Sequence, residues 1–170
     1  AHFSSLSMIN GRTERATAGI DHGVGIRILD GYRSVYVYAN STKRDKLVAL
    51  ATTASRSLQS QNRYSCQPLS DLFSHEPKYV KIMPDSQSQN KKKALLKTAS
   101  AAASSTDAKI TQTTASYADM NKEVWLANSG GRFVYDRRVR TRMTIEAIAS
   151  NSTEKQSGYL GPGMGVCLLY

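Results

Sequence analysis

Two glycines and an arginine stand inside a segment that otherwise alternates as a strand does. Gly23, Gly25 and Arg27 are spaced two apart, with apolar residues between them over 24–28, and this period of two is typical of a strand with one buried face. Because glycine leaves no side chain on its face, another group comes close there. A substrate or partner strand would approach through main-chain hydrogen bonds. Packing of a helix is the alternative, and the residues alone favour packing.

A second set of residues with chemical potential alternates in the same way. Arg138, Arg140 and Arg142 project to one face of a predicted strand. Such a stripe would contact phosphates or other anions, with strong salt dependence. The alternative is an exposed sheet edge that charge keeps from pairing with other strands. No aromatic residue interleaves with these arginines to stack on nucleobases, so the exposed edge is the favoured interpretation.

The three histidines do not form a recognisable metal site. His2, His22 and His75 are far apart in sequence, and Glu76 after His75 is followed at once by Pro77, which opposes a helix. A single histidine without a nucleophile or a metal partner has no assembled chemistry. We therefore predict that this chain carries neither catalytic residues nor metal ligands.

Composition bounds the partners and the compartment. The chain has 170 residues, a net charge of +10 and two cysteines, Cys66 and Cys167, whose spacing indicates neither a disulfide framework nor a zinc site. The net charge suggests nucleic acid as a partner. The favoured alternative is that this chain carries an unbalanced share of a larger protein's charge. No apolar run reaches the roughly 20 residues that cross a bilayer, and the start does not resemble a secretory leader. We expect a cytoplasmic protein without membrane contact.

Two predicted hairpins open the chain. Each turns at a dipeptide that tolerates the backbone of a tight turn, Asn10-Gly11 in the first and Asp30-Gly31 in the second. The strands are residues 3–9, 12–18, 23–28 and a run that ends at 35–38. Together they are expected to form one four-stranded meander.

Two helices are predicted to cover the sheets. The first spans 42–60, with Thr42 as its N-terminal cap and a stripe of leucines and alanines on one side. The second spans 86–103 and has a similar apolar stripe, with the lysines at 91–93 on its solvated side.

The remaining segments complete an α+β prediction. Residues 61–85 contain three of the four prolines and form an irregular connection with a short strand at 79–83. Turns are expected at 119–121, 129–131 and 151–153. They separate four further strands, 110–117, 122–128, 132–150 and 155–159. This second meander repeats the order of the first, which suggests duplication, so the expected fold is mostly antiparallel meander sheets covered by two or more helices.

Several motifs together resemble one family. Those motifs are Gly23-Val24-Gly25-Ile26-Arg27, the hairpin through Asp30-Gly31 to Tyr36 and Tyr38, the helix after it, Trp125-Leu126-Ala127-Asn128-Ser129-Gly130-Gly131, and Gln156-Ser157-Gly158-Tyr159. In this order and spacing they are similar to the N-terminal domain of the TldD/PmbA peptidases, once described as modulators of DNA gyrase. The resemblance spans nearly the whole chain.

The resemblance implies a cytoplasmic zinc metallopeptidase that matures or degrades small peptides as a two-subunit assembly around an enclosed chamber. In the metal-binding branch the zinc ligands lie on a helix with a His-Glu-x-x-x-His motif, and no residue of this chain matches that motif. We therefore expect no cofactor in this chain and zinc in the full-length members of that branch. The expected partners are the remainder of a parent chain, a partner subunit in a homo- or heterodimer, and a peptide substrate. Tyr36 and Tyr38, which share one face of their predicted strand, are candidates for the inter-subunit surface; the alternative is the ordinary occurrence of aromatic residues on a half-covered sheet.

The resemblance also implies how the chain is organised. Residues 1–159 are expected to be the N-terminal domain, with internal halves at about 1–60 and 86–159. Residues 160–170 resemble the glycine-rich strand that leads into the metal helix, with Tyr170 where the first histidine would stand; the alternative is a closing stretch over 158–163 followed by frayed or foreign residues. The predicted function is the non-catalytic part of a peptidase. A basic nucleic-acid-binding module and a peptide-binding module without hydrolysis are the alternatives.

Overall fold

The computed structural model describes residues 1–59, 62–75 and 80–164, and it divides into two compact units. The larger unit takes in Ala1–Ile20, Asp71–Leu126 and Phe133–Tyr170, and the smaller one takes in Asp21–Ser70 and Ala127–Arg132. Each unit is described by itself.

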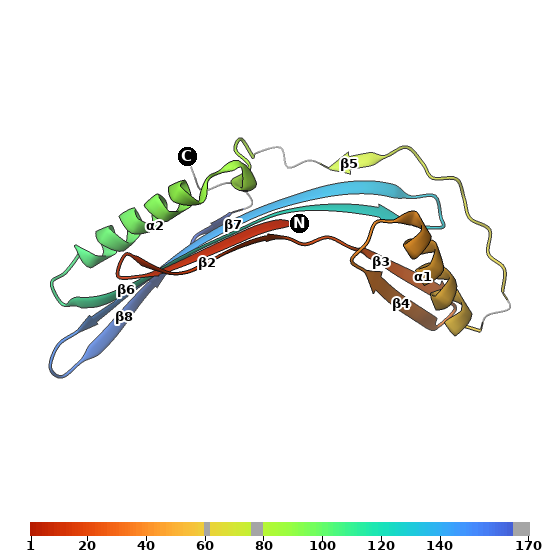
Figure 1. Ribbon diagram of the computed structural model, residues 1–170. Helices are drawn as coiled ribbons and strands as arrows, with labels where there is room; N and C mark the ends of the chain where they lie inside the picture. The colour runs from red at the N-terminus through yellow and green to blue at the C-terminus, as the bar shows by residue number, and fades with distance from the viewer. Residues whose placement is uncertain (60–61, 76–79, 165–170) are drawn as a thin grey trace. The chain divides into compact units, whose positions relative to one another are not determined.

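The larger unit is built on a seven-stranded sheet (Figure 1). Its long strands lie in the order β2–β1–β6–β7, and the short strands β5, β8 and β9 pair with β7. The bounds are β1 His2–Ile9, β2 Arg12–Ile20, β5 Phe73–His75, β6 Ile110–Ala127, β7 Phe133–Ser150, β8 Lys155–Leu160 and β9 Gly163–Met164. β1 pairs antiparallel with β2 and β6, as β7 does with β8 and β9, whereas β5 runs parallel to β7. Together with two helices, this confirms the α+β prediction.

The first hairpin is confirmed. Asn10 and Gly11 occupy the turn with φ of 49° and 72°, the left-handed region that these two residue types tolerate. The backbone N–H of Asn10 also donates to the carbonyl oxygen of Thr113 at 2.8 Å. The turn is thereby tied to β6, the strand on the other side of β1.

The turn expected at 119–121 is wrong, because β6 runs through it as a single strand. Asp119, Met120 and Asn121 pair in unbroken register with Ser4, Phe3 and His2 of β1. The side chains of Asp119 and Asn121 are buried and bonded rather than solvated. Polar residues typical of turns are therefore accommodated here by tertiary partners.

One helix, α2 (Gln89–Ser104), lies along one face of this sheet (Figure 1). The Ser88 side chain caps it by accepting from the Lys91 backbone N–H at 3.4 Å, and a short 3-10 turn, η1 (Pro84–Ser86), precedes it. Leu96 packs into the core of the unit, whose other buried members are Leu6, Met8, Ala115 and Tyr117. The helix predicted at 86–103 is confirmed with slightly later ends.

The smaller unit holds the second hairpin, β3 (Val24–Asp30) and β4 (Arg33–Ala39), and the helix α1 (Arg44–Ser57). The hairpin is confirmed, but it forms a two-stranded sheet of its own, so the expected four-stranded meander is wrong. Alternation sets which face of each hairpin is buried, but it does not determine which strands become neighbours, and β1 pairs with β6 instead.

Two local details of this unit differ from expectation. The turn lies one residue later than predicted, because Asp30 still pairs with Arg33 in the ladder. Thr42 does not cap α1: the N-cap residue is Lys43, which makes no side-chain cap bond. The Ser41 hydroxyl instead accepts from the Lys43 backbone N–H at 3.3 Å.

The connection between the two predicted halves is irregular over 62–72, as its prolines indicate, and then forms β5 beside β7. Residues 80–83 are not in a strand, and Tyr79 of the expected strand lies outside the described residues. The expected repeat of one four-stranded meander by another is not found. The strands β1 to β4 are divided between two sheets, and β6 covers two of the strands that were predicted for the second meander. The chain does reverse at 129–131 and 151–153 as predicted.

Candidate functional site

The alternating arginines of β7 lie on the sheet face opposite α2. Arg138, Arg140 and Arg142 are exposed, while Val139 and Thr141 between them are buried. Since successive side chains of a strand point to opposite faces, the arginines share the face that no described helix of the larger unit covers. This places the stripe where the sequence predicted it, and whether it contacts an anion stays a prediction.

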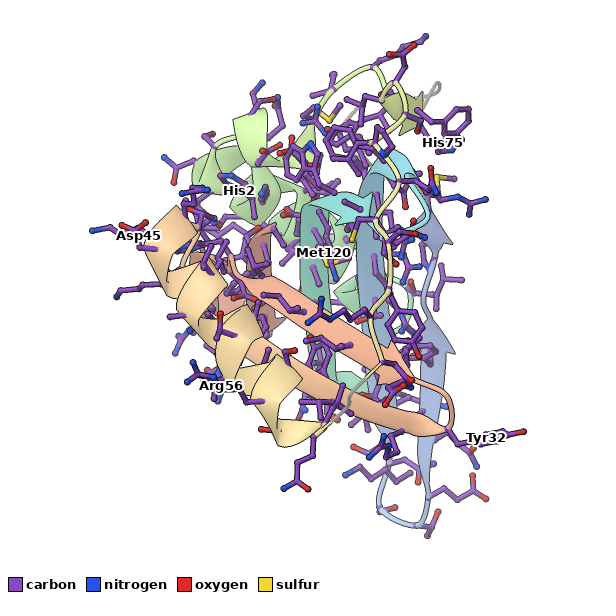
Figure 2. The ribbon with its side chains drawn as sticks, turned by 90° about the vertical axis from the view of Figure 1, so that its right-hand side faces the viewer. His2, Tyr32, Asp45, Arg56, His75 and Met120 are labelled. Carbon is purple, nitrogen blue, oxygen red and sulfur yellow. The ribbon has the colours of Figure 1, made fainter. Side chains whose placement is uncertain are left out.

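A shallow cavity of about 660 Å³ follows this stretch of β7. Ala118 and Met120 of β6 line it, and Figure 2 labels Met120 on its strand. At one end stands His75 of β5, which pairs with Asp136, and at the other stands Met164 of β9, which pairs with Thr141. The two short strands therefore bound the cavity along β7.

The cavity is positively charged. The Arg138 side chain pairs with the Asp136 carboxylate at 2.5 Å, and Arg142 donates to the Tyr159 hydroxyl at 3.2 Å. Arg140 has no carboxylate partner among the described residues. The fourth lining arginine, Arg137, lies on the other face, where it donates to Asn121. Two of the three guanidinium groups of the stripe thus keep an uncompensated charge.

Behind the cavity, inside the sheet–helix interface, lies a buried ion pair. The Lys92 ammonium lies 2.5 Å from the Asp119 carboxylate, and both side chains are only 3% exposed. The ammonium also donates to the Ser4 hydroxyl at 2.9 Å, and that hydroxyl donates to Asp119 at 2.8 Å. The Lys92 nitrogen stands 5.6 Å from the centre of the Tyr117 ring. Lys92 is therefore not on the solvated side of its helix as predicted, because its partner Asp119 lies beneath it.

Gly23, which immediately precedes β3, and Gly25 within β3 face the tyrosines of β4. A side chain at Gly23 would collide with the Tyr38 ring and with the Ala39 carbonyl oxygen, and one at Gly25 would collide with the Tyr36 ring. The apolar residues between them turn to the other face, toward α1. The close approach expected at these glycines is therefore made by aromatic rings of the neighbouring strand.

This hairpin face is open to solvent among the described residues. Tyr36 is 64% exposed and Tyr38 is 50% exposed, and Leu29 and Arg27 are exposed on the same side. Tyr32 projects from the hairpin tip, as Figure 2 shows. An additional strand or a partner surface at Gly23, Gly25 and Arg27 stays a prediction.

A carboxylate that the sequence analysis treated only as a turn residue organises the smaller unit. Asp30 is buried and accepts from Arg33 at 2.7 Å, from Asn62 at 2.8 Å and from the Tyr64 hydroxyl at 2.7 Å. Arg33 also donates to the Leu58 carbonyl oxygen at the end of α1. The hydrogen bond to Asp30 raises the pKa of Tyr64, because ionised tyrosine cannot donate it. Asp30 thereby fastens the irregular connection to the hairpin.

No metal site assembles in the described residues, where no three His, Cys, Asp or Glu side chains converge. His2 and His75 belong to different strands of the larger unit and stand apart in Figure 2. Cys66 is an exposed free thiol, and Cys167 lies outside the described residues. Neither described helix combines the length and apolar character that a membrane span requires.

The fold and these surfaces define a class of protein. Residues 2–58 match the family model described as PmbA/TldA metallopeptidase domain 1, and residues 82–167 match the model described as the central domain of the same family. The chain belongs to the PmbA/TldD metallopeptidase family. The irregular connection separates the two matched segments. The family resemblance inferred from the motifs is confirmed.

Individual relatives support this assignment. The Metalloprotease TldD homolog of Haemophilus influenzae is 25% identical over 146 residues, which are 85% of this chain and 30% of the relative. A modulator of a DNA gyrase from Thermotoga maritima shares the fold with a TM-score of 0.77 at 19% identity, over 97% of this chain and 37% of that one. TldE from Thermococcus kodakarensis shares the fold with a TM-score of 0.62 at 14% identity, over 95% of this chain and 37% of that one. This chain therefore spans about a third of the length of these relatives.

The metal that the family's description implies does not fit the described part of this chain. A catalytic zinc usually has three protein ligands and an open position, and no such set is present among the described residues. The glycine-rich ending, where the resemblance placed the approach to the metal helix, is described only as far as Met164.

Proposed function

We propose that this chain is the non-catalytic N-terminal part of a PmbA/TldD-type metallopeptidase that matures or degrades peptides. In this role the bare face of the larger sheet forms a wall of the substrate chamber, and the β3–β4 hairpin docks a partner subunit. The observation that carries the proposal is the cavity along β7, which lies on the sheet face opposite α2, the described helix of the larger unit. Ligand sites are usually preformed, concave surfaces with a few polar groups that fix the ligand's orientation.

The docking part of the proposal rests on the aromatic face of the hairpin. Tyr36, Tyr38 and Leu29 expose large apolar surfaces side by side, and tyrosine is enriched in protein interfaces. The occupant is a second copy of this chain or a homologous subunit. The hairpin is stiffened by α1 on its other face, so it offers a preformed surface.

Sedimentation velocity at increasing protein concentration tests the docking of a second copy. We expect a reversible dimer, and we expect Tyr36→Ser combined with Tyr38→Ser to weaken it at least about tenfold, the loss of two interface anchors. Tyr32→Ser is the matched control, because Tyr32 is exposed at the tip of the same hairpin. A monomer at every concentration, or equal weakening by the control, would contradict docking through this face.

Zinc and a cytoplasmic location belong to the same proposal. The zinc would be held by parts of the full-length protein other than the described residues, and the exposed thiol of Cys66 suits a reducing compartment. Nucleic acid is the competing partner because of the net charge of +10. Retention on heparin and on duplex DNA over a salt series separates the two, since tight and steeply salt-dependent binding to DNA would favour the nucleic-acid function.

A further inference from the structure

The arginine stripe has a repeat that matches an extended peptide. Arg138, Arg140 and Arg142 occupy every second position of one strand, so neighbouring members are roughly 7 Å apart along β7. Side chains on one face of an extended peptide have the same repeat. Three carboxylates at alternate peptide positions can therefore each face one guanidinium group.

The charges around the stripe leave room for such carboxylates. Asp136 already pairs with Arg138, but the Tyr159 hydroxyl that contacts Arg142 is neutral in its usual state. Asp119 also lines the cavity, yet its charge is taken by the buried Lys92. Arg140 and Arg142 are thus the two arginines of the stripe that have no carboxylate partner among the described residues.

We propose that this cavity binds extended acidic peptides that carry Asp or Glu at every second residue. The inference rests on the proposed function and names the class of peptide that the chamber wall selects. Guanidinium groups bind carboxylates in planar, often bidentate pairs. Ala118 and Met120 supply an apolar floor beneath the stripe, against which the peptide's side chains pack.

A single-stranded nucleic acid fits this cavity less well. Single strands bind by stacking their bases on aromatic side chains within a basic groove, and no Phe, Tyr or Trp is among the described residues that line this cavity. The stripe offers three exposed arginines, one of which is already paired, so few phosphates would be neutralised.

Fluorescence anisotropy with the 170-residue chain tests the inference directly. The probes are three fluorescein-labelled hexapeptides: Glu-Ala-Glu-Ala-Glu-Ala, its glutamine counterpart, and Glu-Glu-Glu-Ala-Ala-Ala, which has the same charge without the alternation. We expect the alternating acidic peptide to bind about tenfold more tightly than the glutamine peptide, as exposed ion pairs with Arg140 and Arg142 and a weaker contact with the already paired Arg138 would give. The clustered peptide should bind with intermediate affinity, and the preference should decline with salt.

Two triple variants, each lacking three positive charges, distinguish binding at the stripe from a general effect of net charge. Arg138→Gln, Arg140→Gln and Arg142→Gln together should abolish the preference, whereas the control Arg44→Gln, Lys46→Gln and Arg56→Gln on the exposed surface of α1 should keep it. Figure 2 shows Arg56 projecting away from α1. Circular dichroism and the affinity for the glutamine peptide report whether the stripe variant is still folded.

The outcomes distinguish this inference from the proposed function. Equal affinities for the acidic and glutamine peptides would overturn the inference and leave the peptide-binding function standing. Failure of all three peptides to bind would contradict the proposed function itself. Tighter binding of a labelled single-stranded DNA hexamer, lost in the same stripe variant, would overturn the peptide assignment in favour of nucleic acid.

Discussion

Replacing Lys92 with methionine should strongly destabilise the larger unit. The substitution retains most of the side-chain volume but leaves the Asp119 carboxylate buried, with the Ser4 hydroxyl as its remaining donor from this cluster. Removing one partner of a buried ion pair costs about 3–5 kcal/mol. For a chain of this size that loss corresponds to a decrease in Tm of roughly 6–20 °C.

Urea unfolding followed by tryptophan fluorescence measures this loss of stability specifically in the larger unit. Trp125 is the only tryptophan of the chain and lies in the larger unit, with its ring centre 5.0 Å from that of Tyr135. Lys91→Met is the matched control, because Lys91 is the exposed neighbour on the same helix, and surface substitutions usually change stability by less than about 0.5 kcal/mol.

A double variant completes the test. Lys92→Met combined with Asp119→Leu removes both charges, so it should be less destabilising than Lys92→Met alone, since burying an unpaired charge is the larger cost. The reasoning is refuted if Lys92→Met costs no more than Lys91→Met. It is also refuted if the double variant's loss in free energy of unfolding equals the sum of the losses for Lys92→Met alone and Asp119→Leu alone.

Three further predictions concern local features. Ser88→Ala should destabilise the larger unit by about 1 kcal/mol in urea unfolding, because it removes the cap of α2; no loss would show that the cap is dispensable. Gly131→Ala should increase hydrogen exchange over 67–70 and 127–132 more than the control Gly31→Ala does over its own turn. Both glycines have a positive φ, but of the two only Gly131 would place a Cβ against a backbone atom, 2.6 Å from the Pro68 carbonyl oxygen. Equal effects of the two variants would exclude the collision. Tyr64 should ionise above the usual range of tyrosine, so its hydrogen bond stabilises the fold below that range and is lost as pH rises through the raised pKa. Absorbance at alkaline pH should show a late-titrating component that is smaller by one tyrosine in Tyr64→Phe, and an unchanged titration would contradict the bond to Asp30.

The sequence predicted what depends on local patterns. Both hairpins, both helices and the alternating faces of the strands follow from turn dipeptides and from periods of two and 3.6 residues. The arginine stripe follows in the same way, because alternation on a strand places Arg138, Arg140 and Arg142 on one face whatever the neighbouring strands are.

What the sequence did not predict depends on contacts between distant residues. Asp119 and Asn121 have the composition of a turn, and partners from other elements make them favourable inside a strand. Asp119 is bonded by Lys92 and Ser4, and Asn121 by Arg137 and Asp85. The strand β5 pairs with β7 from within a segment that has no strand pattern of its own. Asp30 occupies a typical turn position, and its role depends on Asn62 and Tyr64, more than 30 residues away.

We infer that this chain is a scaffold for a metallopeptidase and that its described residues do not themselves carry the metal. Equilibrium dialysis of the 170-residue chain against micromolar zinc, followed by measurement of zinc per chain, tests that claim directly. We predict much less than one equivalent of tightly bound zinc, unchanged by replacing His2, His22 and His75 with alanine. One equivalent of zinc that survives dialysis and is lost with those histidines would contradict it.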